Sequence, residues 1–142
     1  MSQNLIVLPV AALVLWTFIV LVLMAKARAQ SQREQGRTTQ DMALTTDADW
    51  GPAALKAANN YKNLFEVPVL FYAVTAFALI TQNVDGLMLA LAWLFVATRV
   101  AHSIIHVTSN IVMWRGPVFM IGLLTVMIMW ALLVWRIATG GA

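Results

Sequence analysis

The chain has 142 residues, of which 61% are hydrophobic, with 9 Lys and Arg against 6 Asp and Glu and a net charge of +3. Charged residues make up 11% of the sequence, against about 25% in soluble domains, which excludes a disordered segment and argues against an ordinary soluble domain. No cysteine is present, so disulfides and cysteine-ligated metals are excluded, and any thiol chemistry requires a thiol supplied by a substrate.

The first predicted element is a membrane helix over about residues 5–25, an uncharged run rich in Leu, Val and Ile. A helix needs about 20 apolar residues to cross a bilayer. Small residues near Ala25 and Ala27 also suggest the cleavage site of a signal peptide. However, residues 1–4 contain no basic residue and the apolar run is longer than a signal sequence requires, which favours a retained anchor.

A polar segment, 26–51, is predicted to be a loop, and a second helix to span 52–82. Gly51-Pro52 after an acidic stretch is typical of a helix start. This helix is expected to begin in water and to enter the membrane several turns later. We expect a kink at Pro68, because the proline ring removes the hydrogen bond to the carbonyl of Leu64.

Two further helices are predicted, over 87–109 and 117–137, after a five-residue connection at 82–86. Arg99 and His102 interrupt the first of these apolar runs, and Gly116-Pro117 marks the start of the second. The predicted fold is therefore an all-α integral membrane protein, a four-transmembrane-helix bundle formed by a single domain over residues 1–142.

The basic residues predict the orientation of this bundle, because cytoplasmic loops carry an excess of Lys and Arg. Arg136 alone lies near one membrane face, and Arg99 lies within a span. Seven basic residues lie near the other face: Lys26, Arg28, Arg33, Arg37, Lys56, Lys62 and Arg115. We therefore expect both termini outside and the long first loop in the cytoplasm.

Polar residues recur at helical spacing in two of the spans. The second helix carries Lys56, Asn59, Asn63 and Glu66, and the third carries Arg99, His102, His106 and Ser109. Residues three and four apart share a helix face, so these stripes are predicted to meet Arg115 in one cavity open to the cytoplasm. Arg99 lies roughly 16 Å deep, given a rise of about 1.5 Å per residue.

Such a lining suits a small anion that also carries an ammonium group. Arg99 and Arg115 can bind carboxylates or a thiolate. Glu66 can receive the ammonium, while Asn59 and Asn63 can bind amides. The apolar remainder of the cavity would admit a lipophilic partner from the bilayer.

Structural alternatives stay open for Glu66, His102 and His106. Glu66 can form an i,i+4 pair with Lys62 at the helix surface, or a structural ion pair with Arg99. His102 and His106 can be neutral histidines that bond between helices. Their helix offers no carboxylate or cysteine to complete a metal site, so no metal is predicted.

Three motifs are similar to those of the MAPEG superfamily, the membrane-associated proteins of eicosanoid and glutathione metabolism, in a bacterial-type form. They are Asn63-x-x-Glu66-x-Pro68, Arg99-x-x-His102-Ser103 and Arg115-Gly116-Pro117. The four spans, the long first loop and the outward termini agree with that family, so the resemblance covers nearly the whole chain.

The resemblance implies a homotrimer in the inner membrane that binds glutathione, as co-substrate and without a metal, at subunit interfaces on the cytoplasmic side. Asn63 and Glu66 match the family's glutathione-binding pair, and Arg99 matches its third-helix arginine. Arg115 matches the catalytic arginine that stabilises the thiolate. Arg28 matches the basic residue at the end of the first helix.

His102 and two departures from the family pattern complete the predicted binding set. Asn59 replaces an arginine and His106 replaces a tyrosine, which implies either a different thiol or a relative without catalysis.

The leading hypothesis is a membrane-bound glutathione-dependent transferase or peroxidase acting on lipophilic electrophiles or lipid hydroperoxides. The first alternative is a non-catalytic protein of the same fold that binds a lipid or a partner protein. The second is a small multidrug-type transporter driven by Glu66. Nucleic acid is not an expected partner.

Overall fold

The computed structural model describes residues 2–43 and 47–140. These residues form helices only: η1 (Gln3–Ile6), α1 (Val7–Glu34), α2 (Thr39–Met42), η2 (Asp47–Trp50), α3 (Pro52–Asn63), α4 (Val67–Ile80), α5 (Gly86–Val107) and α6 (Val112–Thr139). Four stretches are long and apolar enough to cross a membrane: Gln3–Glu34, Pro52–Ile80, Gly86–Val107 and Val112–Thr139. The all-α class and the four membrane-length spans are thereby confirmed.

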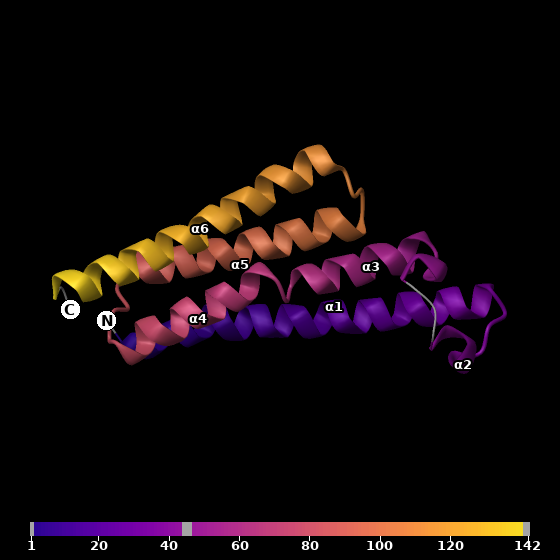
Figure 1. Cartoon of the computed structure of the whole chain (residues 1–142), viewed down its shortest axis with the longest axis horizontal. Helices are drawn as coiled ribbons and strands as arrows, with labels where there is room; N and C mark the ends of the chain where they lie inside the picture. Colours follow the sequence, from indigo (N-terminus) through magenta and orange to yellow (C-terminus); the bar gives the residue numbers. More distant parts are fainter. Residues whose placement is uncertain (1, 44–46, 141–142) are drawn as a thin grey trace.

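The helices form an elongated bundle with both termini at one end (Figure 1). α5 packs most extensively against α6, and α1 packs against α3. α1 and α3 reach beyond the α5–α6 connection at the opposite end, where α2 also lies. The structure therefore has a terminal end and a loop end, and these two names are kept below.

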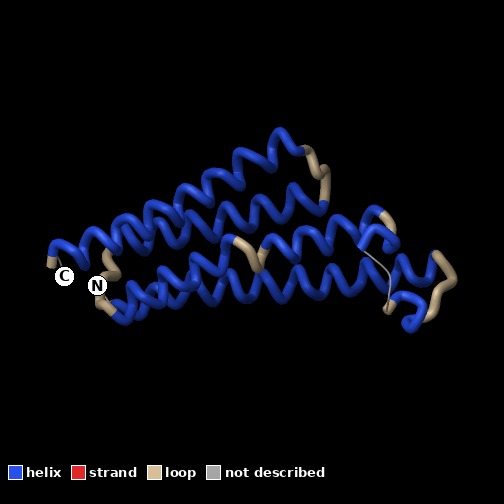
Figure 2. Tube along the Cα trace, viewed as in Figure 1, coloured by secondary structure: helices blue, strands red, loops and turns tan. Residues whose placement is uncertain are grey.

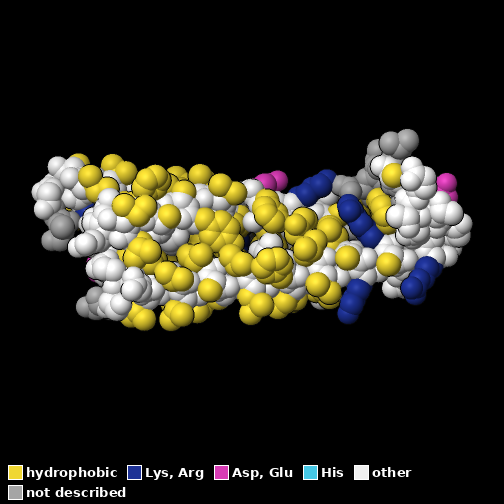
Figure 3. All heavy atoms as spheres, turned by 90° about the horizontal axis from the view of Figure 1, so that it is seen from below, with side chains coloured by type: hydrophobic (Ala, Val, Ile, Leu, Met, Phe, Trp, Pro, Cys, Tyr) yellow, Lys and Arg dark blue, Asp and Glu magenta, His cyan; other side chains and the backbone are white. Residues whose placement is uncertain are grey.

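A dry core joins α1, α4, α5 and α6. Leu13, Phe71, Phe95 and Met129 are fully buried in it, and the rings of Phe71 and Phe95 stack with centroids 4.6 Å apart. The outer surface is also apolar over most of its length, while Lys and Arg gather toward the loop end (Figure 3). An apolar exterior is what contact with lipid requires.

α1 ends later than predicted, at Glu34 rather than near residue 25. The predicted loop 26–51 is therefore helical over its first nine residues. These residues include no Gly or Pro and are mostly Ala, Gln, Lys, Arg and Glu, which favour helix even without apolar packing. The helix stops where Gly36 adopts a φ of 62°.

The segment before α3 is fastened to this extension of α1. The Ser31 hydroxyl donates to the carbonyl of Trp50, and the Gln35 amide donates to the carbonyl of Asp49 at 2.9 Å. The guanidinium of Arg28 lies 5.0 Å from the centre of the Trp50 ring. α3 then begins at Pro52 as predicted, after Gly51 with a φ of 83°.

The second span is broken, where a kinked helix was predicted. α3 ends at Asn63 and α4 begins at Val67, and Pro68 occupies the first turn of α4 (Figure 2). The first turn is where a proline costs least, because its missing N–H has no intrahelical partner to lose. Glu66, with φ and ψ both at −95°, lies outside both helices.

The α5–α6 connection is also displaced relative to the prediction. α5 ends at Val107, and α6 begins at Val112 rather than at 117. Arg115 therefore lies inside the first turn of α6, and Pro117 is within the helix rather than at its start.

At the terminal end, hydrogen bonds join three parts of the chain. The Gln3 side chain donates to the Val84 carbonyl at 3.1 Å and accepts from the Val84 amide at 2.8 Å. Arg136 Nη2 pairs with Asp85 Oδ2 at 2.6 Å, and its Nη1 donates to the Asn83 carbonyl at 3.2 Å. The start of the chain, the α4–α5 turn and the end of α6 are thus held together.

This pairing predicts a pH-dependent stability. The hydrogen bond from Arg136 holds the pKa of Asp85 below its usual value. The ionised Asp85 carboxylate therefore adds to the free energy of unfolding. This stabilisation is complete above the pKa of an Asp in the unfolded chain, about 3.9, and it is lost as the pH falls through the lower pKa of Asp85 in the folded protein. We expect the melting temperature of the wild type to fall more between pH 6 and 3 than that of Asp85→Asn. Equal falls would contradict this.

Candidate functional site

The predicted site residues meet, in part, in a cavity of about 350 Å³ between α3, α5 and α6. α3 contributes its last residue, Asn63, and α5 contributes His102. The remaining lining residues come from the first three turns of α6: Val112, Arg115, Gly116, Phe119 and Met120. The cavity lies toward the loop end, beside the break between α3 and α4.

The local fold holds the Arg115 side chain in place. Its Nη1 donates to the Asn110 side-chain oxygen at 2.7 Å. Asn110 adopts a φ of 52°, a left-handed conformation that asparagine tolerates, and its amide donates to the Ile105 carbonyl at 2.7 Å. No carboxylate is among the residues that line the cavity, so the cavity carries a net positive charge suited to an anion.

Arg99 lies behind the wall of this cavity, rather than on its surface. Its side chain is 1% exposed, and its Nη2 donates to the Phe119 carbonyl at 2.9 Å. The guanidinium lies between two rings, 5.1 Å from the centre of Phe95 and 4.8 Å from that of Phe119. Its Nε and Nη1 have no partner among the described residues.

The two histidines extend from the cavity wall into the interior. The His102 ring centre lies 5.6 Å from that of Phe119 and 5.7 Å from that of His106. His106 is 4% exposed, and its Nδ1 has no partner among the described residues. Among the residues that the structure describes, no group of three or more His, Cys, Asp or Glu side chains is placed to hold a metal ion.

Besides Arg99 and His106, three predicted site residues do not line the cavity. Glu66 and Asn59 are exposed. Arg28, which is on α1, lies against the ring of Trp50 in η2. Within the described chain, the Glu66 carboxylate forms no hydrogen bond or ion pair, so the alternative of a Glu66–Arg99 pair is not realised in one subunit. The helix break explains this, because Asn63 and Glu66 do not belong to one continuous helix.

Sequence reasoning missed three residues that shape the site. Asn110 orients Arg115, Phe119 accepts a hydrogen bond from Arg99, and Asn60 is 1% exposed with neither side-chain atom partnered among the described residues. Asn60 had a detectable signal, since it lies four residues after Lys56 in the polar run. The carbonyl of Phe119 had none, because backbone contacts depend on helix packing.

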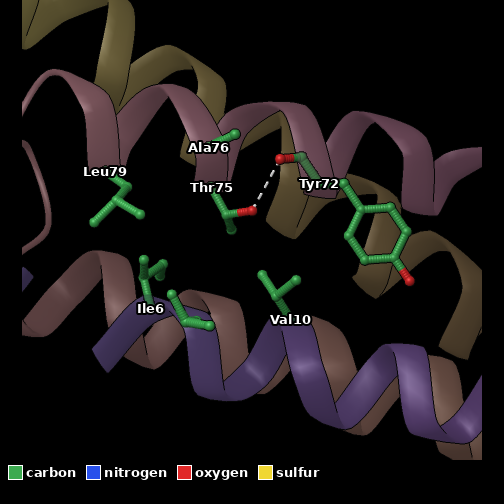
Figure 4. A pocket seen from close by; sticks show the side chains of 7 residues that line it. Ile6, Val10, Tyr72, Thr75, Ala76 and Leu79 are labelled. Atoms are coloured by element: carbon green, nitrogen blue, oxygen red, sulfur yellow. Dashed lines mark hydrogen bonds between the residues drawn. The ribbon is translucent and has the colours of Figure 1, made fainter. Parts of the chain in front are cut away.

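A second cavity, of about 180 Å³, lies near the terminal end between the start of the chain and α4 (Figure 4). Ile6 and Val10 face Tyr72, Thr75 and Leu79 across it. The Thr75 hydroxyl is already bonded to the carbonyls of α4, at 2.9 and 3.0 Å. This cavity therefore suits a hydrocarbon chain and not a charged guest.

Comparison with protein-family models matches residues 6–135 to the MAPEG family. Comparisons with curated proteins and with solved structures find no significant match. The matched segment includes the second and third spans, nearly all of the first and fourth, and every residue that lines the polar cavity. Over nearly its whole length, the chain belongs to the MAPEG family.

Proposed function

We propose that this protein is a membrane-bound glutathione-dependent transferase or peroxidase that acts on lipophilic electrophiles or lipid hydroperoxides. One observation carries the proposal: Asn63, His102 and Arg115, from three different helices, line one cavity that contains a cation and no carboxylate. Membership of the MAPEG family is consistent with a glutathione-related role in a membrane.

The chemistry requires glutathione as a thiolate, because the thiolate and not the thiol is the nucleophile. A nearby cation favours the charged form of the sulfur, and Arg115 is the cation of this cavity. Asn63 can hydrogen-bond a peptide amide of glutathione. Phe119 and Met120 provide an apolar wall against which a lipophilic electrophile can lie.

The proposal includes a homotrimer in the inner membrane, with termini outside and glutathione bound between subunits. Glu66 and Asn59 are exposed on the single chain. They belong to the proposed site only when a neighbouring subunit provides its second wall. Glu66 would then receive the glutathione ammonium, and Arg99 would support the cavity from behind.

The test is to follow thiolate absorbance and transfer to a nitroaryl acceptor, with purified protein in detergent or nanodiscs. We expect glutathione to give a thiolate signal at neutral pH and a rate of transfer above that of the uncatalysed reaction. Absence of both signals in folded protein to which glutathione binds would refute the enzymatic proposal.

A non-catalytic role is the second candidate. It is favoured by the exposure of Glu66 and Asn59, and by Asn59 where the family commonly has an arginine. Glutathione or lipid binding without turnover, in an assembled oligomer, would support this second candidate over the first.

A further inference from the structure

Four side chains of α3 and α5 carry buried polar atoms that have no partner among the described residues. These atoms are Asn60 Nδ2 and Oδ1, Arg99 Nε and Nη1, Ser103 Oγ and His106 Nδ1. The four residues are between 1% and 4% exposed. We call Asn60, Ser103 and His106 the polar layer.

The packing of α3 against α5 places Asn60, Ser103 and His106 at the same height along the bundle axis. The two helices contact each other. Lys56 Nζ donates to the Thr108 carbonyl at 3.4 Å, and Asn63 and His102 line the same cavity. The helices are therefore antiparallel, with 56 opposite 108 and 63 opposite 102. Asn60 lies between Lys56 and Asn63, and so faces the part of α5 that carries Ser103 and His106.

Leaving such atoms dry would be costly. A buried polar group without a partner has lost the hydrogen bonds that it made to water in the unfolded chain, and several such groups are gathered here. Internal water is the usual partner of buried groups of this kind, with about three hydrogen bonds each. The layer offers what water needs: an amide that donates and accepts, a hydroxyl, and an imidazole nitrogen.

We propose that the polar layer binds internal water behind the glutathione cavity, and that this water carries the thiol proton to His106 and on to solvent. The second half rests on the proposed function. His102 lines the cavity, and its ring centre lies 5.7 Å from that of His106, so the path begins at the cavity wall.

The proton transfer balances without a further reactant. The S–H bond breaks, its electron pair stays on sulfur, and the proton passes through water to the His106 imidazole. His106 is one residue from the end of α5, and it then releases the proton to solvent. His102 on its own helix, Lys56 on α3 and Arg115 on α6 are the neighbouring groups of His106, and the two cations disfavour storage of the charge on it.

The experiment compares Asn60→Leu and Ser103→Ala with a control, Thr125→Val. Thr125 is 3% exposed, and its hydroxyl already donates to the Ile121 carbonyl at 2.7 Å. In a hydrated layer, replacing Asn60 leaves Ser103 and His106 without their water-mediated hydrogen bonds. We therefore expect Asn60→Leu to lower the melting temperature by about 2–4 °C. In a dry layer the same change removes two unpartnered atoms and raises the melting temperature, which would overturn the proposal.

The kinetic arm measures the rate of thiolate formation by stopped flow. We expect both layer variants to bind glutathione as the wild type does, but to form the thiolate at least about tenfold more slowly. Thr125→Val should match the wild type both in binding and in the rate of thiolate formation. Unchanged rates in the layer variants would overturn the relay. If the wild type forms no thiolate at all, the proposed function fails. In that case the melting temperatures of the layer variants and the control still test whether the polar layer binds water.

Discussion

Arg115→Gln is expected to weaken glutathione binding by roughly 10- to 100-fold, because a hydrogen bond to a charged group is worth about 1.5–3 kcal/mol. The thiolate signal should fall with it, since the cavity then has no fixed cation in its lining. Titration of glutathione by calorimetry, followed by thiolate absorbance at saturation, measures the two effects separately.

Two variants serve as controls for this result. Arg136→Gln removes the same charge at the terminal end, where Arg136 pairs with Asp85, and should leave binding unchanged. Asn110→Gly keeps the charge of Arg115 and the left-handed backbone at 110, but removes the oxygen to which Arg115 donates. It should show an intermediate loss. Wild-type affinity in folded Arg115→Gln would show that glutathione is held elsewhere.

Gly122→Ala is expected to destabilise the protein by about 1–3 kcal/mol, the usual cost of overpacking a core. A Cβ at 122 would collide with Arg99 Nη2, and would lie 2.7 Å from Thr98 Oγ1 and 3.0 Å from Arg99 Cζ. Since Arg99 is held between Phe95 and Phe119, its guanidinium has little room to move. Thermal unfolding in detergent measures the effect.

Gly116 provides the matched control, because it lies on the same helix and a Cβ there would meet nothing within 4 Å. Gly116→Ala should keep or slightly raise the melting temperature, given the higher helix propensity of alanine. Adding Arg99→Met to Gly122→Ala should recover part of the loss. Equal melting temperatures for the two alanine variants would show that Arg99 does not occupy the space beside Gly122.

The sequence by itself determined the membrane-spanning architecture. Four apolar runs, one polar segment and the Gly51-Pro52 start of α3 are local signals, and they require no knowledge of packing. Helical spacing also singled out Asn63 and His102, which were predicted to meet Arg115, and these three side chains do share a cavity.

Only the tertiary structure decided which polar residues face that cavity. The break at residues 64–66 separates Asn63 from Glu66, although a spacing of three predicts one face. Arg99 lies behind Phe119 rather than in the cavity, and Asn60 is buried with no side-chain partner among the described residues. Helix rotation and the placement of a break follow from side-chain packing between elements, which periodicity along one helix does not encode.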